Sequence, residues 1–284
     1  MLAGRVPNST ATSHSMTSRL PACPPDWIVP DWPAPPGVRA VFTTRAGGVS
    51  EGPWASMNLG DHVGDAPVAV AANRAFLAKA IGAQPVFLQQ VHGTRTVGLD
   101  GTDPDGVPCA DACTGTLPGL ACTVMVADCL PVLLTDRAGR QVAAAHAGWR
   151  GLADGVLEAA LERFGAPAGA AGWLPAMDLI AWLGPCIGPG AFEVGDEVRA
   201  AFVARQAAAA DCFRPVAGSP GKWWADLAGL ARQRLAAAGV PAVYGNDGGA
   251  GWCTVSNPSR FFSHRRDAGR LGSSGRMAAC IWRI

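Results

Sequence analysis

The sequence predicts a mixed α+β (α/β) fold, and three observations lead to this class. First, short apolar runs bounded by Gly, Pro and Asp are typical of buried strands. Second, other segments carry apolar residues at helical spacing, with helix start and stop signals. Third, the two kinds of segment alternate from residue 38 to residue 282, with no repeat, long linker or break in composition. We therefore expect one domain over residues 21–284.

Strands are expected where an apolar run ends at turn residues. The first covers residues 38–44 and ends at Arg45, just before a Gly-Gly turn. Six later runs have the same character and cover residues 86–91, 121–126, 131–135, 141–146, 178–183 and 277–282. Three of these runs end at or near a histidine or a cysteine, which makes them candidates for carrying a site.

Four helices are expected between the strands. Residues 67–81 begin with Pro in the first turn and stop at Gly82. Two further helices are expected at 195–206 and 224–238. Residues 149–164 should form an amphipathic helix, because one face collects Leu152, Val156, Leu157, Leu161 and Phe164.

Composition argues against a nucleic-acid or membrane partner. The formal net charge is only +1, and no apolar stretch approaches the ~20 residues that span a bilayer. Residues 1–20 are rich in Ser and Thr and lack the apolar core of a secretory signal, so we expect a disordered tail. The nine cysteines form no C-x-x-C pair, which favours reduced thiols and a cytoplasmic location.

Three segments each place one metal ligand or nucleophile at the end of an apolar run. His92, Cys129 and His146 follow the runs at 86–88, 124–126 and 142–144. Sites in open α/β sheets gather at the carboxyl ends of strands, so these side chains are expected to meet. Two histidines and one thiolate suit zinc, with one coordination position left open for chemistry.

Other residues offer weaker candidates. Arg45 and Arg150 each adjoin a glycine turn at a strand end and could bind an anion, or could form ordinary surface salt bridges. His62 could donate a proton or a hydrogen bond in the same crevice, or have no function there. Residues 48–52 match the G-x-S-x-G pattern, but Pro53 and a polar loop follow instead of a helix, which favours a simple turn.

Eight segments in order resemble the YfiH family, which has also been labelled multicopper polyphenol oxidase, laccase domain and peptidoglycan editing factor. The resemblance covers roughly residues 25–284 and departs at 268–276, where the family runs more directly to a Thr-Gly-Arg. The matching segments are FTTRAGGVS (42–50), NLGDHVGD (58–65), QVHG (90–93), ADCLP (127–131), AHAGWRG (145–151), GPCIGP (184–189), FEVG (192–195) and FFSHRRD (261–267).

The resemblance implies a single-domain α/β/β/α layered sandwich and a zinc ion held by His92, Cys129 and His146, which would also be the catalytic residues. It further implies phosphorolysis of the purine nucleosides adenosine, inosine, guanosine and methylthioadenosine, and deamination of adenosine. Separately from the resemblance, we expect a monomer. For phosphorolysis, Arg45 is the expected phosphate or ribose anchor, Arg150 a weaker choice, and His62 a group that protonates or orients the substrate.

Two other functions compete with this reading. A literal polyphenol oxidase needs histidines for several copper centres, and this chain has five histidines and no H-x-H pair, so copper is disfavoured. A thiol amidase that edits peptidoglycan precursors would use Cys129 as nucleophile and His92 or His146 as base. The same three side chains suit the zinc enzyme and the amidase, and the sequence does not choose between them.

Overall fold

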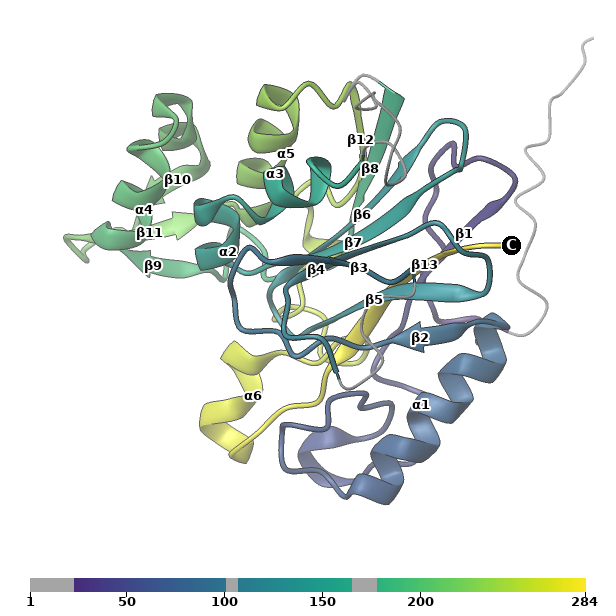
Figure 1. The fold of residues 1–284 in the computed structure, drawn as a ribbon. Helices are drawn as coiled ribbons and strands as arrows, with labels where there is room; N and C mark the ends of the chain where they lie inside the picture. The colour runs from purple at the N-terminus through teal and green to yellow at the C-terminus, as the bar shows by residue number, and fades with distance from the viewer. Residues whose placement is uncertain (1–22, 101–106, 165–177) are drawn as a thin grey trace, which may run out of the picture.

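The computed structural model describes residues 23–100, 107–164 and 178–284, and these residues form four layers in the order helix, sheet, sheet, helix (Figure 1). The expected mixed α+β class and layered sandwich are confirmed. The disordered tail expected at residues 1–20 lies outside the described residues. Within the described part of the chain, no helix is long and apolar enough to cross a membrane.

The first sheet has four strands in the order β1-β13-β5-β2. All neighbours are antiparallel except β2 and β5. One face packs against helix α1, where Leu77 and Ile81 meet the sheet residues Met125 and Trp282. The bounds are β1 (Val38–Phe42), α1 (Pro67–Ile81), β2 (Gln84–Val86), β5 (Leu120–Val126) and β13 (Met277–Arg283).

The second sheet has six strands in the order β12-β8-β6-β7-β4-β3 and lies face to face with the first. Val124 and Ile281 of the first sheet and Leu133, Ala144 and Trp182 of the second belong to the core between them. The strands are β3 (Thr96–Gly98), β4 (Ala112–Gly115), β6 (Leu130–Asp136), β7 (Val142–Ala147), β8 (Leu179–Leu183) and β12 (Ala242–Gly245).

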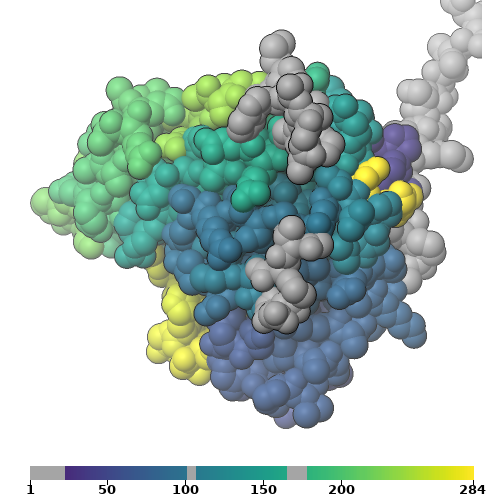
Figure 2. Space-filling model, viewed as in Figure 1, coloured from purple at the N-terminus to yellow at the C-terminus, as the bar shows by residue number. Residues whose placement is uncertain are grey.

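Helices cover the outer face of the second sheet. Leu157 and Leu230 pack there against buried sheet residues such as Leu134. The helices are α2 (Trp149–Asp154), α3 (Val156–Leu161) and α5 (Leu227–Ala237). Beside them a small sheet of order β10-β11-β9 projects to the left in Figures 1 and 2, together with α4. Its elements are β9 (Glu193–Gly195), α4 (Asp196–Val203), the 3-10 helix η3 (Ala207–Cys212), β10 (Phe213–Pro215) and β11 (Lys222–Ala225).

Three expected elements differ from the structure. The helix expected at 149–164 is divided into α2 and α3 by Gly155, whose φ of 109° belongs to the left-handed region. The helix expected at 224–238 starts only after β11, because Asp226 caps its N-terminus by accepting a hydrogen bond from the N–H of Gly229. The strand expected at 86–91 is β2, which ends at Val86, and the chain then leaves the sheet.

One helix was not expected from the sequence. Helix α6 (His264–Leu271) follows Ser263, whose hydroxyl accepts a hydrogen bond from the N–H of Arg266 as an N-cap. Most of its residues are polar and Leu271 is its one large apolar side chain, so no apolar stripe signals a helix. The remaining short elements are the 3-10 helices η1 (Gly52–Trp54) and η4 (Ala250–Trp252).

Candidate metal and active site

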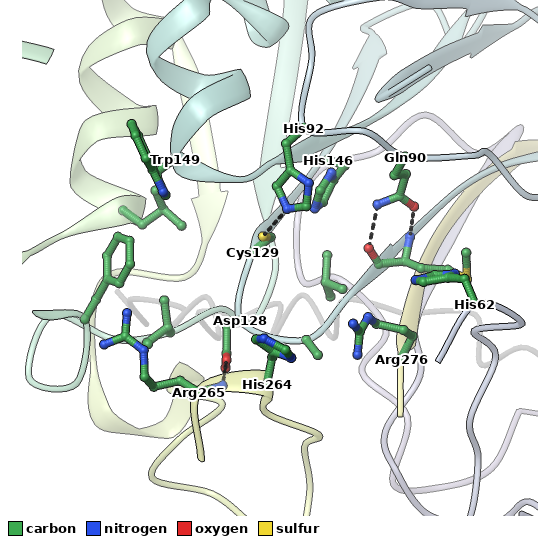
Figure 3. A pocket seen from close by; sticks show the side chains of 16 residues that line it. His62, Gln90, His92, Asp128, Cys129, His146, Trp149, His264, Arg265 and Arg276 are labelled. Carbon is green, nitrogen blue, oxygen red and sulfur yellow. Dashed lines mark hydrogen bonds between the residues drawn. The ribbon is translucent and has the colours of Figure 1, made fainter. Parts of the chain in front are cut away.

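A cavity of about 370 Å³ lies where the two sheets and α6 meet, and the three expected ligands line it (Figure 3). Its volume is in the range of small-molecule sites. The side chains around it come from well-separated parts of the chain and are His62, Gln90, His92, Met125, Val126, Ala127, Asp128, Cys129, His146, Trp149, Ile187, Phe192, Leu227, His264, Arg265 and Arg276.

His92 lies on a loop, not at the end of a strand. Gln90 holds this loop against β5, because its side-chain amide accepts from the N–H of Met125 at 2.7 Å and donates to the carbonyl of Met125 at 2.8 Å. The carboxylate of Asp111 holds it from the other side by accepting the backbone N–H of His92 at 2.9 Å. His92 itself has a φ of 61°, a conformation that non-glycine residues seldom adopt and that places its ring over the cavity.

Cys129 lies at the turn between β5 and β6, and the preceding residue fixes this turn. Asp128 has a φ of 91°, and its carboxylate accepts hydrogen bonds from Thr254 Oγ1 and from the N–H of Arg265, both at 2.6 Å. Its carbonyl accepts from the N–H of Ile187 at 2.9 Å. These contacts tie the turn to three other segments and leave the Cys129 thiol half-buried, facing the cavity.

His146 lies at the end of β7 and is buried, with 3% of its surface exposed. Its Nδ1 is 2.8 Å from Oδ1 of Asp111, a carboxylate with no exposed surface. An ionised carboxylate only accepts hydrogen bonds, so Nδ1 carries the proton and Nε2 is the atom left for a ligand.

The three expected ligands meet at one point. Their donor atoms all lie within 4.8 Å of one another, and Cys129 Sγ is 3.7 Å from His92 Nε2. Bonds of 2.0–2.3 Å around tetrahedral zinc separate such atoms by about 3.3–3.6 Å, so the three donor atoms lie close to the spacing that zinc requires. The group could therefore hold a metal ion with one position open to the cavity.

Gly148 leaves the space that this arrangement needs. A Cβ atom at this position would lie 2.7 Å from His92 Cδ2 and 3.1 Å from Cys129 Sγ. The backbone φ is −64°, which any residue adopts, so glycine is required here for space and not for conformation.

The charges of the site couple the thiol to the histidines. Burial alone would raise the pKa of Cys129, but the positive charge of His146 and hydrogen bonds from His146 and His92 lower it to about 6. Burial alone would lower the pKa of His146, but the Cys129 thiolate and the bond to Asp111 raise it to about 9. The lowered pKa of Cys129 and the raised pKa of His146 both favour a thiolate–imidazolium pair at neutral pH, and the thiolate is the form that ligates zinc.

Comparison with known proteins shows which family the chain belongs to. A family model described as multi-copper polyphenol oxidoreductase laccase matches residues 39–284. Curated relatives and solved structures that carry the name YfiH match over most of the chain. The chain belongs to the YfiH family.

Relatives in the YfiH family align over nearly their whole length. A purine nucleoside phosphorylase of Pseudomonas aeruginosa is 51% identical over 256 residues, which cover 90% of this chain and 98% of the relative. Purine nucleoside phosphorylase YfiH of Escherichia coli is 48% identical with the same coverage. The crystal structure of a Neisseria meningitidis protein of the DUF152 family has a TM-score of 0.80 and 45% identity, over 91% of this chain and 99% of that one.

Of the other residues expected at the site of this YfiH-family chain, one lines the cavity and two do not. His62 lines the cavity, where it is exposed and 3.4 Å from Asp61 Oδ1. Arg45 does not line it: its guanidinium donates to the carbonyls of Ala55 and Pro258 and stacks on the ring of Phe262 at 4.7 Å. These contacts hold loops together and leave Arg45 outside the wall of the cavity in which the phosphate anchor was expected.

Arg150 is likewise absent from the cavity wall. Its guanidinium lies 4.4 Å from the ring of Trp149, and Trp149 is the residue that faces the cavity. The local sequence places both residues at the start of α2, but only one of two adjacent helical positions can point into the site.

Two important site residues were missed from the sequence. Asp111 supports both histidines, yet it lies between expected strands with no motif of its own. Arg276 lines the cavity and is half-buried; burial lowers the pKa of its guanidinium, although the nearby Cys129 and Asp128 raise it. Its signal was the Ser274-Gly275-Arg276 sequence, which stands where the family has Thr-Gly-Arg.

Proposed function

We propose that this protein is a zinc-dependent purine nucleoside phosphorylase acting on adenosine, inosine, guanosine and methylthioadenosine, with adenosine deaminase activity. The observation that carries the proposal is the convergence of His92, Cys129 and His146, with one ligand position facing a nucleoside-sized cavity. The phosphorylase names of the relatives from Pseudomonas aeruginosa and Escherichia coli support the substrate class.

The donor set fits zinc better than a group of oxidase coppers. Imidazole and thiolate are ligands that zinc prefers, and the buried Asp111 beside His146 is the hydrogen-bond partner typical of a ligating histidine. The five histidines of the whole sequence are too few for several copper centres. When bound, zinc supplies a Lewis acid that polarises water or a substrate oxygen at the open position.

The cavity has one apolar side and one charged side, which suit different parts of the substrates. Trp149, Phe192 and Leu227 form an apolar side that suits the flat face of a purine. Arg276 and His62 lie together on the opposite side of the ligand group in Figure 3. This charged side suits phosphate, and we assign Arg276 the anchoring role first expected for Arg45.

In the phosphorolysis step, an oxygen of phosphate forms a bond to C1′ of the ribose while the bond from C1′ to N9 of the purine breaks. The electron pair of that bond remains on the base, which then takes up a proton. Arg276 holds the phosphate dianion, His62 on the same side orients it, and the departing base takes its proton from water. We place the reaction in the cytoplasm, in a monomer with one catalytic domain over residues 21–284. The nine free cysteines support the reducing compartment.

A thiol amidase is the second candidate, and one observation favours it. Asp111, His146 and Cys129 follow one another as orienting carboxylate, base and nucleophile, the order found in cysteine hydrolases. In the zinc enzyme, His146 and Cys129 would instead be ligands and Asp111 would support His146. The geometry of these three residues therefore suits the amidase and the zinc enzyme equally.

Cys129→Ser separates the two functions. If Cys129 is a zinc ligand, the variant should lose bound zinc and phosphorolysis of inosine together, because a hydroxyl is a poor substitute for a thiolate. Zinc content and release of hypoxanthine in the presence of phosphate are measured on the same preparation. Full zinc content with loss of all activity would identify Cys129 as a nucleophile. Cys109→Ser, which changes an exposed cysteine outside the cavity, is the matched control.

A further inference from the structure

We propose that Asp111 is a positioning residue that orients both histidines for metal binding. It holds the backbone of His92 and fixes the ring proton of His146 on Nδ1. This inference rests on the proposed zinc site and adds to it a residue that contacts neither metal nor substrate. Asp111 has no exposed surface and does not line the cavity. Its effect on the site is therefore exerted through the ligands.

The first part of the role is to hold the His92 loop. Three consecutive backbone N–H groups point at the one carboxylate: Val91 and Gly93 donate to Oδ2 at 3.1 and 2.8 Å, and His92 donates to Oδ1 at 2.9 Å. A run of backbone donors around an anion stabilises an otherwise costly conformation. The left-handed backbone of His92 is such a conformation, and it aims the imidazole at Cys129.

The second part of the role is to choose the tautomer of His146. Oδ1 of Asp111 also accepts from Nδ1 of His146 at 2.8 Å, and the carbonyl of Asp111 accepts from the N–H of His146 at 2.7 Å. The ring is thereby fixed with its proton on Nδ1 and its Nε2 free for the metal. Each carboxylate oxygen accepts two hydrogen bonds, so both oxygens must be acceptors.

An amide cannot satisfy this arrangement in either orientation. If the NH2 of Asn replaced Oδ2, it would face the N–H groups of Val91 and Gly93, donor against donor. If it replaced Oδ1, it would face the N–H of His92 and force Nδ1 of His146 to accept, which moves the ring proton to Nε2. That atom could then no longer bind zinc. Asp111→Asn is therefore nearly isosteric but disturbs one ligand or the other.

The test compares the zinc affinity of Asp111→Asn with that of a matched control. Asp136 is also fully buried, and its carboxylate accepts hydrogen bonds from the backbone N–H groups of Arg140 and Gln141, but it lies outside the cavity. We expect Asp111→Asn to weaken zinc binding ~10–100-fold in competition with a chromophoric chelator, the usual effect of losing a ligand's hydrogen-bond partner. Asp136→Asn should lower the melting temperature of the metal-free protein and change zinc affinity less than twofold.

Equal zinc affinity of Asp111→Asn and the wild type would overturn the role of Asp111. Failure of the wild type itself to bind zinc would instead refute the proposed function. If Asp111→Asn does not fold, the nitrogen chemical shifts of His146 in the zinc-loaded wild type decide the matter. A proton on Nδ1 with zinc on Nε2 supports the inference, and zinc on Nδ1 contradicts it.

Discussion

Gly148→Ala tests whether packing holds the ligand group at metal-binding distances. The new Cβ would lie 2.7 Å from His92 Cδ2 and 3.1 Å from Cys129 Sγ, whereas such atoms rest about 3.5–4.0 Å apart. The His92 ring must then retreat by about 1 Å, and metal–ligand distances tolerate only about 0.2 Å. Without metal the exposed ring can turn away, so the cost falls mainly on the metal-bound state.

The expected magnitude follows from the cost of overpacking. Forcing one methyl group into a packed site costs about 1–3 kcal/mol, which corresponds to zinc affinity weaker by roughly 5–150-fold. Chelator competition gives the dissociation constant, and thermal unfolding of the metal-free protein should change little. Gly269→Ala is the control, since a Cβ there meets nothing within 4 Å. Zinc affinity of Gly148→Ala within twofold of wild type would refute the steric reasoning.

Two further predictions concern the anion and the thiol. Arg276→Ala should raise the KM for phosphate at least ~10-fold and affect adenosine deamination less, because its guanidinium is the proposed phosphate anchor. Arg45→Ala should lower the melting temperature and leave the ratio of phosphorolysis to deamination unchanged. The reverse pattern would indicate that Arg45 is the phosphate anchor. In metal-free protein, alkylation of Cys129 should rise with pH through about 6, because its pKa is lowered and the reactive thiolate is present above that value. Peptide mass spectrometry measures it, and a midpoint near 8.5 would contradict the thiolate–imidazolium pair.

The fold was predictable wherever the local pattern and the packing agree. Helix α1 has the expected bounds because its proline start and glycine stop are local signals. Strands β5, β6 and β7 are fully or almost fully buried and read as apolar runs. Helix α6 was missed because its stability comes from a capping serine and tertiary contacts, and not from an apolar stripe.

The convergence of the three candidate ligands was predictable from the sequence, and the residues that support them were not. His92, Cys129 and His146 are rare residue types at the ends of apolar runs, and the structure brings them together. Asp111 has an ordinary residue type, and its importance arises only when β4 pairs with β7 and brings it beside His146. The sequence could not place Arg45 relative to the cavity, because a guanidinium beside a glycine turn can bind backbone carbonyls as well as an anion.

The most direct measurement is the product analysis of inosine incubated with phosphate and the zinc-loaded wild-type protein. We predict hypoxanthine and ribose 1-phosphate in equal amounts, with turnover that stops when zinc is removed and returns when it is restored. Free ribose in place of ribose 1-phosphate, or no release of base at all by the zinc-loaded protein, would contradict a phosphorylase.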